Sequence, residues 1–250
     1  MRTADFSRIL VEAIQFCGLD RDEISDPTFA QIRDFAALRL RHVWEYDTFP
    51  QVIKFQEVLL TQVNGAPAFE LPADCGTVIS IWSLNPLSTT RNAQLTFILN
   101  GTKAYLTIAR EGKVWVEYRT RPPELFGLGW QQAVEYKVGS QAFFDVGSLS
   151  GAYKPQAGRV FSGNFYNCKV NNVNKRPSEH TDEWEKVEIP YEFAPYVARA
   201  VFADYLRSEG QLDSARIAEA EAQAFLDEEI DKISRQQGQI RRINFINPYS

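Results

Sequence analysis

Few side chains in this sequence have the chemistry of a metal ligand or a nucleophile. The two histidines, His42 and His180, are 138 residues apart, and the three cysteines, Cys17, Cys75 and Cys168, are also widely spaced. A zinc site would have to draw its ligands from these scattered residues. The sequence contains none of the short motifs CxxC, HExxH, GxSxG, GxGxxG or the phosphate-binding loop. We therefore expect no catalytic residue, no metal and no cofactor.

Composition narrows the function classes further. The 250 residues are 44% hydrophobic and 24% charged, which is typical of a folded chain with one large or two modest domains. With 27 basic and 32 acidic residues the formal charge is −5, so the chain lacks the basic field of a dedicated nucleic-acid binder. No apolar run approaches the roughly 20 residues of a membrane span, and the first residues do not form a signal peptide. Three dispersed cysteines suit a reducing compartment without disulfides.

The elements that could position functional side chains begin with two N-terminal helices. The first is predicted from an apolar stripe with helical spacing, closed by Gly18, and the second from Asp26-Pro27 as N-cap and first-turn proline. The first stripe is Phe6, Ile9, Leu10, Ala13, Ile14 and Cys17, and the second is Phe29, Ile32, Ala36, Leu40 and Val43.

Two more helices are predicted near the C-terminus. Pro195 opens one that Gly210 closes, and the other runs to about Arg235. Its predicted apolar stripe is Ile217, Ala220, Ala224, Leu226, Ile230 and Ile233. Residues 204–235 hold nine acidic and four basic side chains, a net charge of −5. This acidity indicates either a solvated helix face or an inward-facing ring of carboxylates in an oligomer.

Between the helices the sequence changes to β patterns. Asn64-Gly65 and Asn100-Gly101 each separate two β-rich runs, which predicts two hairpins. The stretch from Trp130 to Pro190 is instead rich in aromatic residues, glycine and asparagine. We expect an α+β fold, with a helical core built from the N- and C-terminal helices, a β-hairpin and sheet region, and a small inserted β module. The predicted parts are 1–50 (helical), 51–126 (β region), 127–190 (inserted module), 191–237 (helical) and 238–250 (extended tail).

The inserted module carries a pattern of aromatic residues and glycines. Its residues are Trp130, Tyr136-Lys-Val-Gly139, Phe143-Phe144, Gly163-Asn-Phe-Tyr166-Asn-Cys168, Pro177 and Trp184. This pattern resembles the small chitin-binding-type carbohydrate-binding modules (family 5/12-like), which also occur as decorations on viral structural proteins. The resemblance implies that Trp130, Tyr136, Tyr166 and Trp184 bind a glycan. The same four rings could instead form a miniature hydrophobic core.

The rest of the chain has a recognisable order of parts. A helical pair ends near His42-Val-Trp-Glu-Tyr46, a β section contains Phe69-Glu-Leu-Pro-Ala-Asp74, and a late helical pair ends at Arg235-Gln-Gln-Gly-Gln239. This layout is similar to the head-to-tail adaptor (connector) proteins of tailed bacteriophages, and the Leu-Pro-x-Asp segment resembles the tubular tail proteins of short-tailed phages. The resemblance implies a homo-oligomeric ring, commonly of twelve copies, below the portal protein in the virion neck.

In such a ring the genomic DNA passes through the channel without sequence-specific binding, and the lower face meets the next neck or tail protein. The protein would be made in the host cytoplasm and would need no membrane. The C-terminal tail is apolar and aromatic with two arginines, although it follows a strongly acidic helix. We expect Arg241, Arg242, Phe245, Ile246 and Tyr249 to dock on the portal. The alternative is that this tail packs back on its own domain.

Three function classes follow from these observations. The first is a structural, non-enzymatic head-to-tail adaptor. The second is a virion or tail protein that binds glycan through residues 130–190. The third is a hydrolase, for which the sequence shows no converging acid, base and nucleophile.

Overall fold

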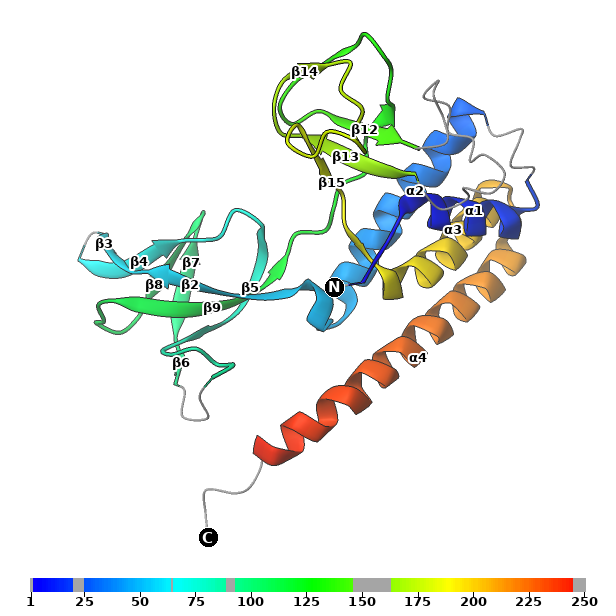
Figure 1. Cartoon of the computed structure of the whole chain (residues 1–250). Coiled ribbons are helices and arrows are strands. Elements are labelled where there is room, and N and C mark those ends of the chain that lie inside the picture. Colours follow the sequence, from blue (N-terminus) through cyan, green and yellow to red (C-terminus); the bar gives the residue numbers. More distant parts are fainter. Residues whose placement is uncertain (1, 20–24, 64, 89–92, 146–162, 245–250) are drawn as a thin grey trace. The chain divides into compact units, whose positions relative to one another are not determined.

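The computed structural model describes residues 2–19, 25–63, 65–88, 93–145 and 163–244 of the chain. It confirms the predicted α+β class: the N-terminal helices α1 and α2 pack with the C-terminal helices α3 and α4, and several small, mainly antiparallel sheets lie between them in sequence (Figure 1). The chain divides into two compact units. The first comprises residues up to 46 together with 123–232, and the second comprises 47–122 with the described residues after Lys232.

Four helices form the framework of the first unit, the last of them as far as Lys232. They are α1 (Phe6–Cys17), α2 (Asp26–Tyr46), α3 (Ala194–Ser208) and α4 (Leu212–Asn244). Both predicted N-terminal stripes are buried except for Cys17, which is half-buried, and Gly18 ends α1 in the left-handed conformation with φ 67°. The predicted N-cap Asp26 is wrong. The helix already includes Asp26, and the Ser25 hydroxyl accepts a hydrogen bond from the Thr28 amide at 3.3 Å.

Helix α4 is rotated relative to the predicted stripe. Ala215, Ala218, Ala222 and Leu226 are buried, whereas Ile217 is 65% exposed and Ala220 and Ala224 are also exposed. The physical reason is close packing between helices. Ala215 and Ala218 join Ala203 and Leu206 of α3 in one buried cluster, because small side chains let the two helices approach. The predicted stripe therefore contains three residues that face solvent, Ile217, Ala220 and Ala224.

The strands of the first unit belong to three small sheets. They are β1 (Thr3–Ala4), β10 (Leu128–Gly129), β11 (Glu135–Tyr136), β12 (Gln141–Phe144), β13 (Asn164–Cys168), β14 (Asn172–Val173), β15 (Trp184–Lys186) and β16 (Ile189–Pro190). The four-stranded sheet has the order β10-β12-β13-β15, in which only the β10–β12 pair is parallel. Strand β1 pairs with β16, and β11 with β14.

The four-stranded sheet of the module packs directly on α1. The Phe6 ring lies 4.8 Å from Phe165 and 6.0 Å from Phe143, between ring centroids. The Phe6 amide donates to Asn164 Oδ1 at 3.3 Å, and the Ser7 amide donates to the Gly163 carbonyl at 2.9 Å. Residues 127–190 and the helices thus share buried contacts within one compact unit.

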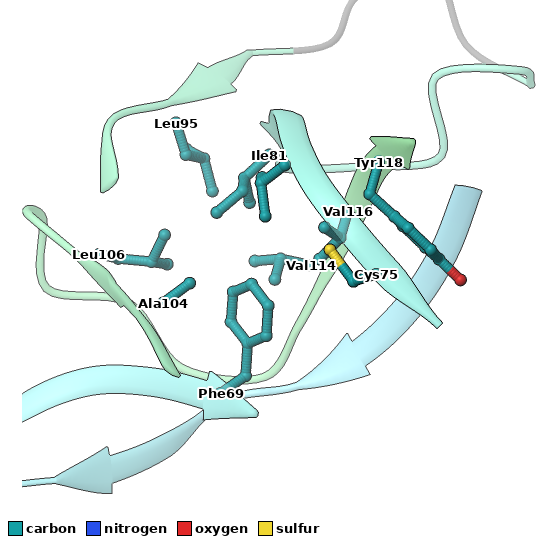
Figure 2. Packing of buried hydrophobic residues seen from close by; sticks show 10 residues of the cluster. Phe69, Cys75, Ile81, Leu95, Ala104, Leu106, Val114, Val116 and Tyr118 are labelled. Carbon is teal, nitrogen blue, oxygen red and sulfur yellow. The ribbon is translucent and has the colours of Figure 1, made fainter. Parts of the chain in front are cut away.

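The second unit contains two four-stranded antiparallel sheets. One has the order β2 (Ile53–Leu59), β9 (Lys113–Thr120), β5 (Cys75–Trp82) and β6 (Gln94–Leu95). The other has the order β3 (Thr61–Val63), β4 (Ala66–Glu70), β8 (Lys103–Leu106) and β7 (Phe97–Asn100). Figure 2 shows side chains of both sheets meeting in one core, among them Phe69 and Ala104 from one sheet and Ile81 and Val116 from the other. The core residue Cys75 is a free cysteine.

Both hairpins of this unit occur where the sequence predicts them. Strands β7 and β8 pair up to Asn100 and Lys103, with Gly101 in the turn at φ 60°. Strands β3 and β4 pair up to Val63 and Ala66. Gly65, in the turn between them, has φ 80°, while Asn64 lies outside the described residues. Glycine adopts such positive φ angles without steric cost, which explains the two hairpin signals.

Candidate interaction surfaces

The four aromatic residues proposed for glycan binding lie in or beside the core of the module. Trp130, Tyr166 and Trp184 are buried and Tyr136 is half-buried. The Tyr136 and Trp184 rings meet edge to face at 5.1 Å between centroids. The Trp184 indole N–H donates to the Lys175 carbonyl at 3.0 Å. A ring can stack on a sugar only through an exposed face, so this geometry favours the miniature-core interpretation of these residues.

The C-terminal docking residues fall partly within α4. The helix runs to Asn244 and therefore includes Arg241 and Arg242, whereas Phe245, Ile246 and Tyr249 lie outside the described residues. The prediction that residues 238–244 are extended is wrong. One glycine inside a helix costs only about 1 kcal/mol, which the helix-forming glutamine, isoleucine and arginine residues around Gly238 offset.

As far as Arg235, the side chains of α4 after Leu226 are less covered than those before it. Between Leu212 and Arg235 the last buried side chain is Leu226, and Ile230 and Ile233 are only half-buried. The helix continues from Asp227 to Asn244, about 27 Å at 1.5 Å per residue. A helix of this length is marginal in water unless an apolar face packs on something. This half of α4 is therefore a candidate contact surface for another chain.

A charged cluster fixes the first half of α4 to α2 and α3. The Arg39 guanidinium donates to Asp204 at 2.6 Å and to Glu219 at 2.6 and 2.8 Å. Arg207 bonds the same two carboxylates. Burial by itself would raise the pKa of Glu219, but the hydrogen bonds from Arg39 and Arg207 outweigh it and lower that pKa. Every charged group in this cluster has a partner of opposite sign. Since the partners come from α2, α3 and α4, the cluster links these three helices.

The two sheets of the second unit present apolar side chains to solvent. Strand pairing places Trp82 opposite Trp115 and Phe55 opposite Glu117 on the outer face, and all three aromatic residues are half-buried. The Trp82 indole N–H donates to Glu117 at 2.9 Å. Among the described residues of this unit, six large apolar side chains are exposed: Leu59, Leu84, Leu87, Ile98, Leu99 and Ile108.

The same unit has sheet edges that its described strands leave unpaired. Among the described residues, β2 pairs only with β9 and β7 pairs only with β8. Unpaired edges and exposed apolar residues together are typical of surfaces that contact another chain. This outer face was not predicted from the sequence. The alternation of Trp115 and Glu117 with the buried Val114, Val116 and Tyr118 was the signal that could have revealed it.

The residues with potential for metal or nucleophilic chemistry are dispersed. Cys75 lies in the core of the second unit and Cys168 in the core of the module. Burial raises the pKa of the Cys17 thiol to about 12, so this thiol is protonated at neutral pH. His42 packs against Tyr46 and Tyr196. Within the described ranges no group of three histidine, cysteine, aspartate or glutamate residues could hold a metal ion.

No protein-family model matches the chain, and no curated protein matches it. None of the helices that the structure describes is both long and apolar enough to cross a membrane.

Proposed function

We propose that this chain is a structural protein of a tailed-bacteriophage virion, an adaptor ring that docks on the portal and connects the head to the tail. The observation that carries the proposal is α4, which extends to Asn244 although its buried side chains, as far as Arg235, end at Leu226. Such a helix gains its packing from a neighbouring chain. The order of parts resembles that of head-to-tail adaptors, and for this reason we assign that neighbour to the virion neck.

The second unit supports the same role. Its unpaired strand edges and exposed apolar side chains suit repeated contacts between chains, which close into a ring when each contact rotates by a fixed angle. In the proposed ring the genomic DNA passes through the channel without sequence-specific contacts. One face of the ring meets the portal and the other meets the next neck or tail protein. This role is structural and involves no reaction.

The C-terminal residues supply the contact with the portal in this proposal. Arg241 and Arg242 meet carboxylates of the portal, and Phe245, Ile246 and Tyr249 enter an apolar groove on it. The charge of the tail differs in sign from that of the acidic segment 204–235 that precedes it, so the two segments suit different surfaces.

Reconstitution tests the proposal directly. The purified chain is mixed with portal rings of the same virus and imaged by negative-stain electron microscopy. We expect a second ring stacked on one face of each portal. Portals that remain bare at micromolar concentrations of the chain would contradict the adaptor function. Bovine serum albumin in place of the chain controls for non-specific stacking.

A further inference from the structure

The two sheets of the second unit are joined by strands that pass from one sheet to the other. Strand β2 continues through Leu60 into β3, and β6 continues through Thr96 into β7. The strands therefore form one cycle around the shared core of Figure 2, in the order β2/β3, β4, β8, β7/β6, β5 and β9. Because the two bent strands are three positions apart in this cycle of six, they lie on opposite sides of a small barrel.

Strand β7 has backbone groups that point away from its neighbour β8. The Thr107 amide donates to the Thr96 carbonyl at 3.1 Å and continues the β7–β8 ladder. Hydrogen-bonded pairs alternate along an antiparallel ladder, so every second residue from Thr96 onward bonds β8. The backbone groups of Phe97 and Leu99 lie between these and point to the other side, where no described strand pairs with β7.

Strand β2 has a second open edge of the same kind. The Leu60 amide donates to the Gly112 carbonyl at 2.9 Å, which continues the β2–β9 ladder. By the same alternation, the backbone groups of Phe55, Glu57 and Leu59 point away from β9, and β2 pairs with no other described strand. Each edge is thus a row of N–H and C=O groups that the edge of another strand can satisfy.

The edge at β7 lacks the features that usually protect an open strand. Soluble proteins protect such edges with charged residues, prolines or bulges. Between Ala93 and Thr102 the sequence has neither a charged residue nor a proline, and the register between β7 and β8 is regular. Ile98 and Leu99 are 62% and 49% exposed. An open hollow of about 350 Å³ lies along the same bent strand and is lined by Gln94, Leu95, Thr96 and Phe97.

The edge at β2 suits an uncharged neighbour. Its two charged residues are Lys54 and Glu57, and both are bonded within the unit, Lys54 to Asp74 and Glu57 to Lys113, each at 2.6 Å. Leu59, at the end of the strand, is 64% exposed. Since the charges of this edge are already paired, an uncharged strand such as β7 meets it without leaving a charge unpaired.

We propose that β7 of one copy pairs with β2 of the next copy, so that their sheets join in the order β3-β4-β8-β7-β2-β9-β5-β6. This inference rests on the proposed function, since it names the contact that builds the ring. The pairing brings the exposed Ile98 and Leu59 to one seam. Every copy carries both edges, on opposite sides of its barrel, so each contact leaves an edge open for the next copy. Pairing of β7 with β7 would instead close a dimer and leave β2 unused.

Two charged substitutions test the contact. Ile98→Asp disables the β7 edge and Leu59→Asp the β2 edge, and both side chains are more than half exposed, so the fold should tolerate them. Self-association is measured by sedimentation velocity over a concentration series, with and without portal rings. We expect each variant to weaken it about tenfold or more. Leu38→Asp on α2 is the matched control, because Leu38 is as exposed as Leu59, and it should assemble like the wild type.

A proline substitution tests whether the backbone makes the contact. The N–H of Leu99 points away from β8, so Leu99→Pro keeps the ladder with β8 and removes a donor from the open edge. Leu99→Ala is its control, since it shortens the side chain and keeps the N–H. We expect Leu99→Pro to associate more weakly than Leu99→Ala. Equal association of the two would contradict pairing between strand edges.

Mixing the two charged variants distinguishes unlike edges from like edges. The Ile98→Asp chain keeps a working β2 edge and the Leu59→Asp chain keeps a working β7 edge, so the mixture should give one-to-one heterodimers and no larger species. Wild-type self-association in either single variant would overturn the inference. Association of Leu59→Asp with itself would show that β7 pairs with β7.

The outcomes separate the inference from the proposed function. Wild-type self-association that both substitutions weaken, without binding to portals, would support the contact and contradict the adaptor role. Rings on portals that both variants form normally would do the opposite. A wild-type chain that stays monomeric with and without portals would overturn both. Far-ultraviolet circular dichroism of each variant shows that the substitution has not unfolded the chain.

Discussion

At the scale of single residues, Arg39 is a side chain that links three helices of the framework. It joins α2 to α3 and α4 by bidentate bonds to Asp204 and Glu219. Arg39→Met would leave these two partly buried carboxylates facing each other with only Arg207 beside them. We expect the free energy of unfolding to fall by about 3 kcal/mol, measured by urea denaturation.

Arg41 provides a control for that substitution on the same helix. Its side chain is 71% exposed and lies 3.7 Å from Glu45. An exposed pair of this kind contributes about 0.5 kcal/mol or less, so Arg41→Met should leave unfolding nearly unchanged. Equal effects of Arg39→Met and Arg41→Met would show that the cluster is not a structural link.

The same cluster predicts a dependence of stability on pH. The pKa of Glu219 is lowered in the folded chain, because the bonds from the two arginines outweigh the effect of burial. A lowered pKa means that this contribution is complete above the ordinary pKa of 4.5 and is lost as the pH falls through the folded value. Urea titrations between pH 7 and pH 3 should show stability falling below about pH 4.5. Glu219→Gln should flatten this fall, and an unchanged slope would contradict the assignment.

Gly163 tests the packing of the module on α1. A Cβ atom at this position would lie 2.7 Å from Phe143 Cζ and would also meet the Ser7 hydroxyl. We expect Gly163→Ala to destabilise the chain by about 1–3 kcal/mol, measured by thermal unfolding. Adding Ser7→Ala removes one of the two close contacts and should recover part of the loss. A neutral Gly163→Ala would mean that the module and α1 are not packed this closely.

At the scale of elements, the adaptor proposal gives the two halves of α4 different roles. The first half is held by its alanines and by the Arg39 cluster, and the second half has no buried side chain between Asp227 and Arg235. Deleting residues 240–250 should therefore leave the free energy of unfolding within about 0.5 kcal/mol of the wild type, while attachment of the chain to portal-bearing heads is lost.

A pull-down of the truncated chain with portal rings measures that loss, and the full-length chain is its control. Undiminished binding to the portal would assign the C-terminal residues to local packing. A large fall in the free energy of unfolding would do the same.

The elements show which features can be predicted from sequence in this chain. The stripes of α1 and α2 and the Asn-Gly hairpins were confirmed, because periodicity and positive φ are local properties. The rotation of α4 was not predicted, since its alanines fit either face and only contact with α3 decides between them. The pairing of β11 with β14 was not predicted either, because the paired residues Glu135 and Val173 are far apart in sequence.

At the scale of the whole molecule, the two units carry different kinds of exposed surface. The first exposes Ile217 together with the acidic side chains Glu221 and Glu228 on α4, and the second has unpaired sheet edges with aromatic residues such as Trp115 on its outer face. A chain that has several unlike exposed surfaces can contact neighbours on more than one side. This distribution is what a ring component between two other assemblies requires.

A cryo-electron microscopy reconstruction of the virion neck, classified without imposed symmetry, tests the central claim most directly. The adaptor proposal predicts a closed ring of many copies of this chain, commonly twelve, immediately below the portal, with the end of α4 and the residues after it against the portal. A neck with one or two copies of the chain, or a virion in which the chain is found only away from the head-to-tail junction, would contradict it.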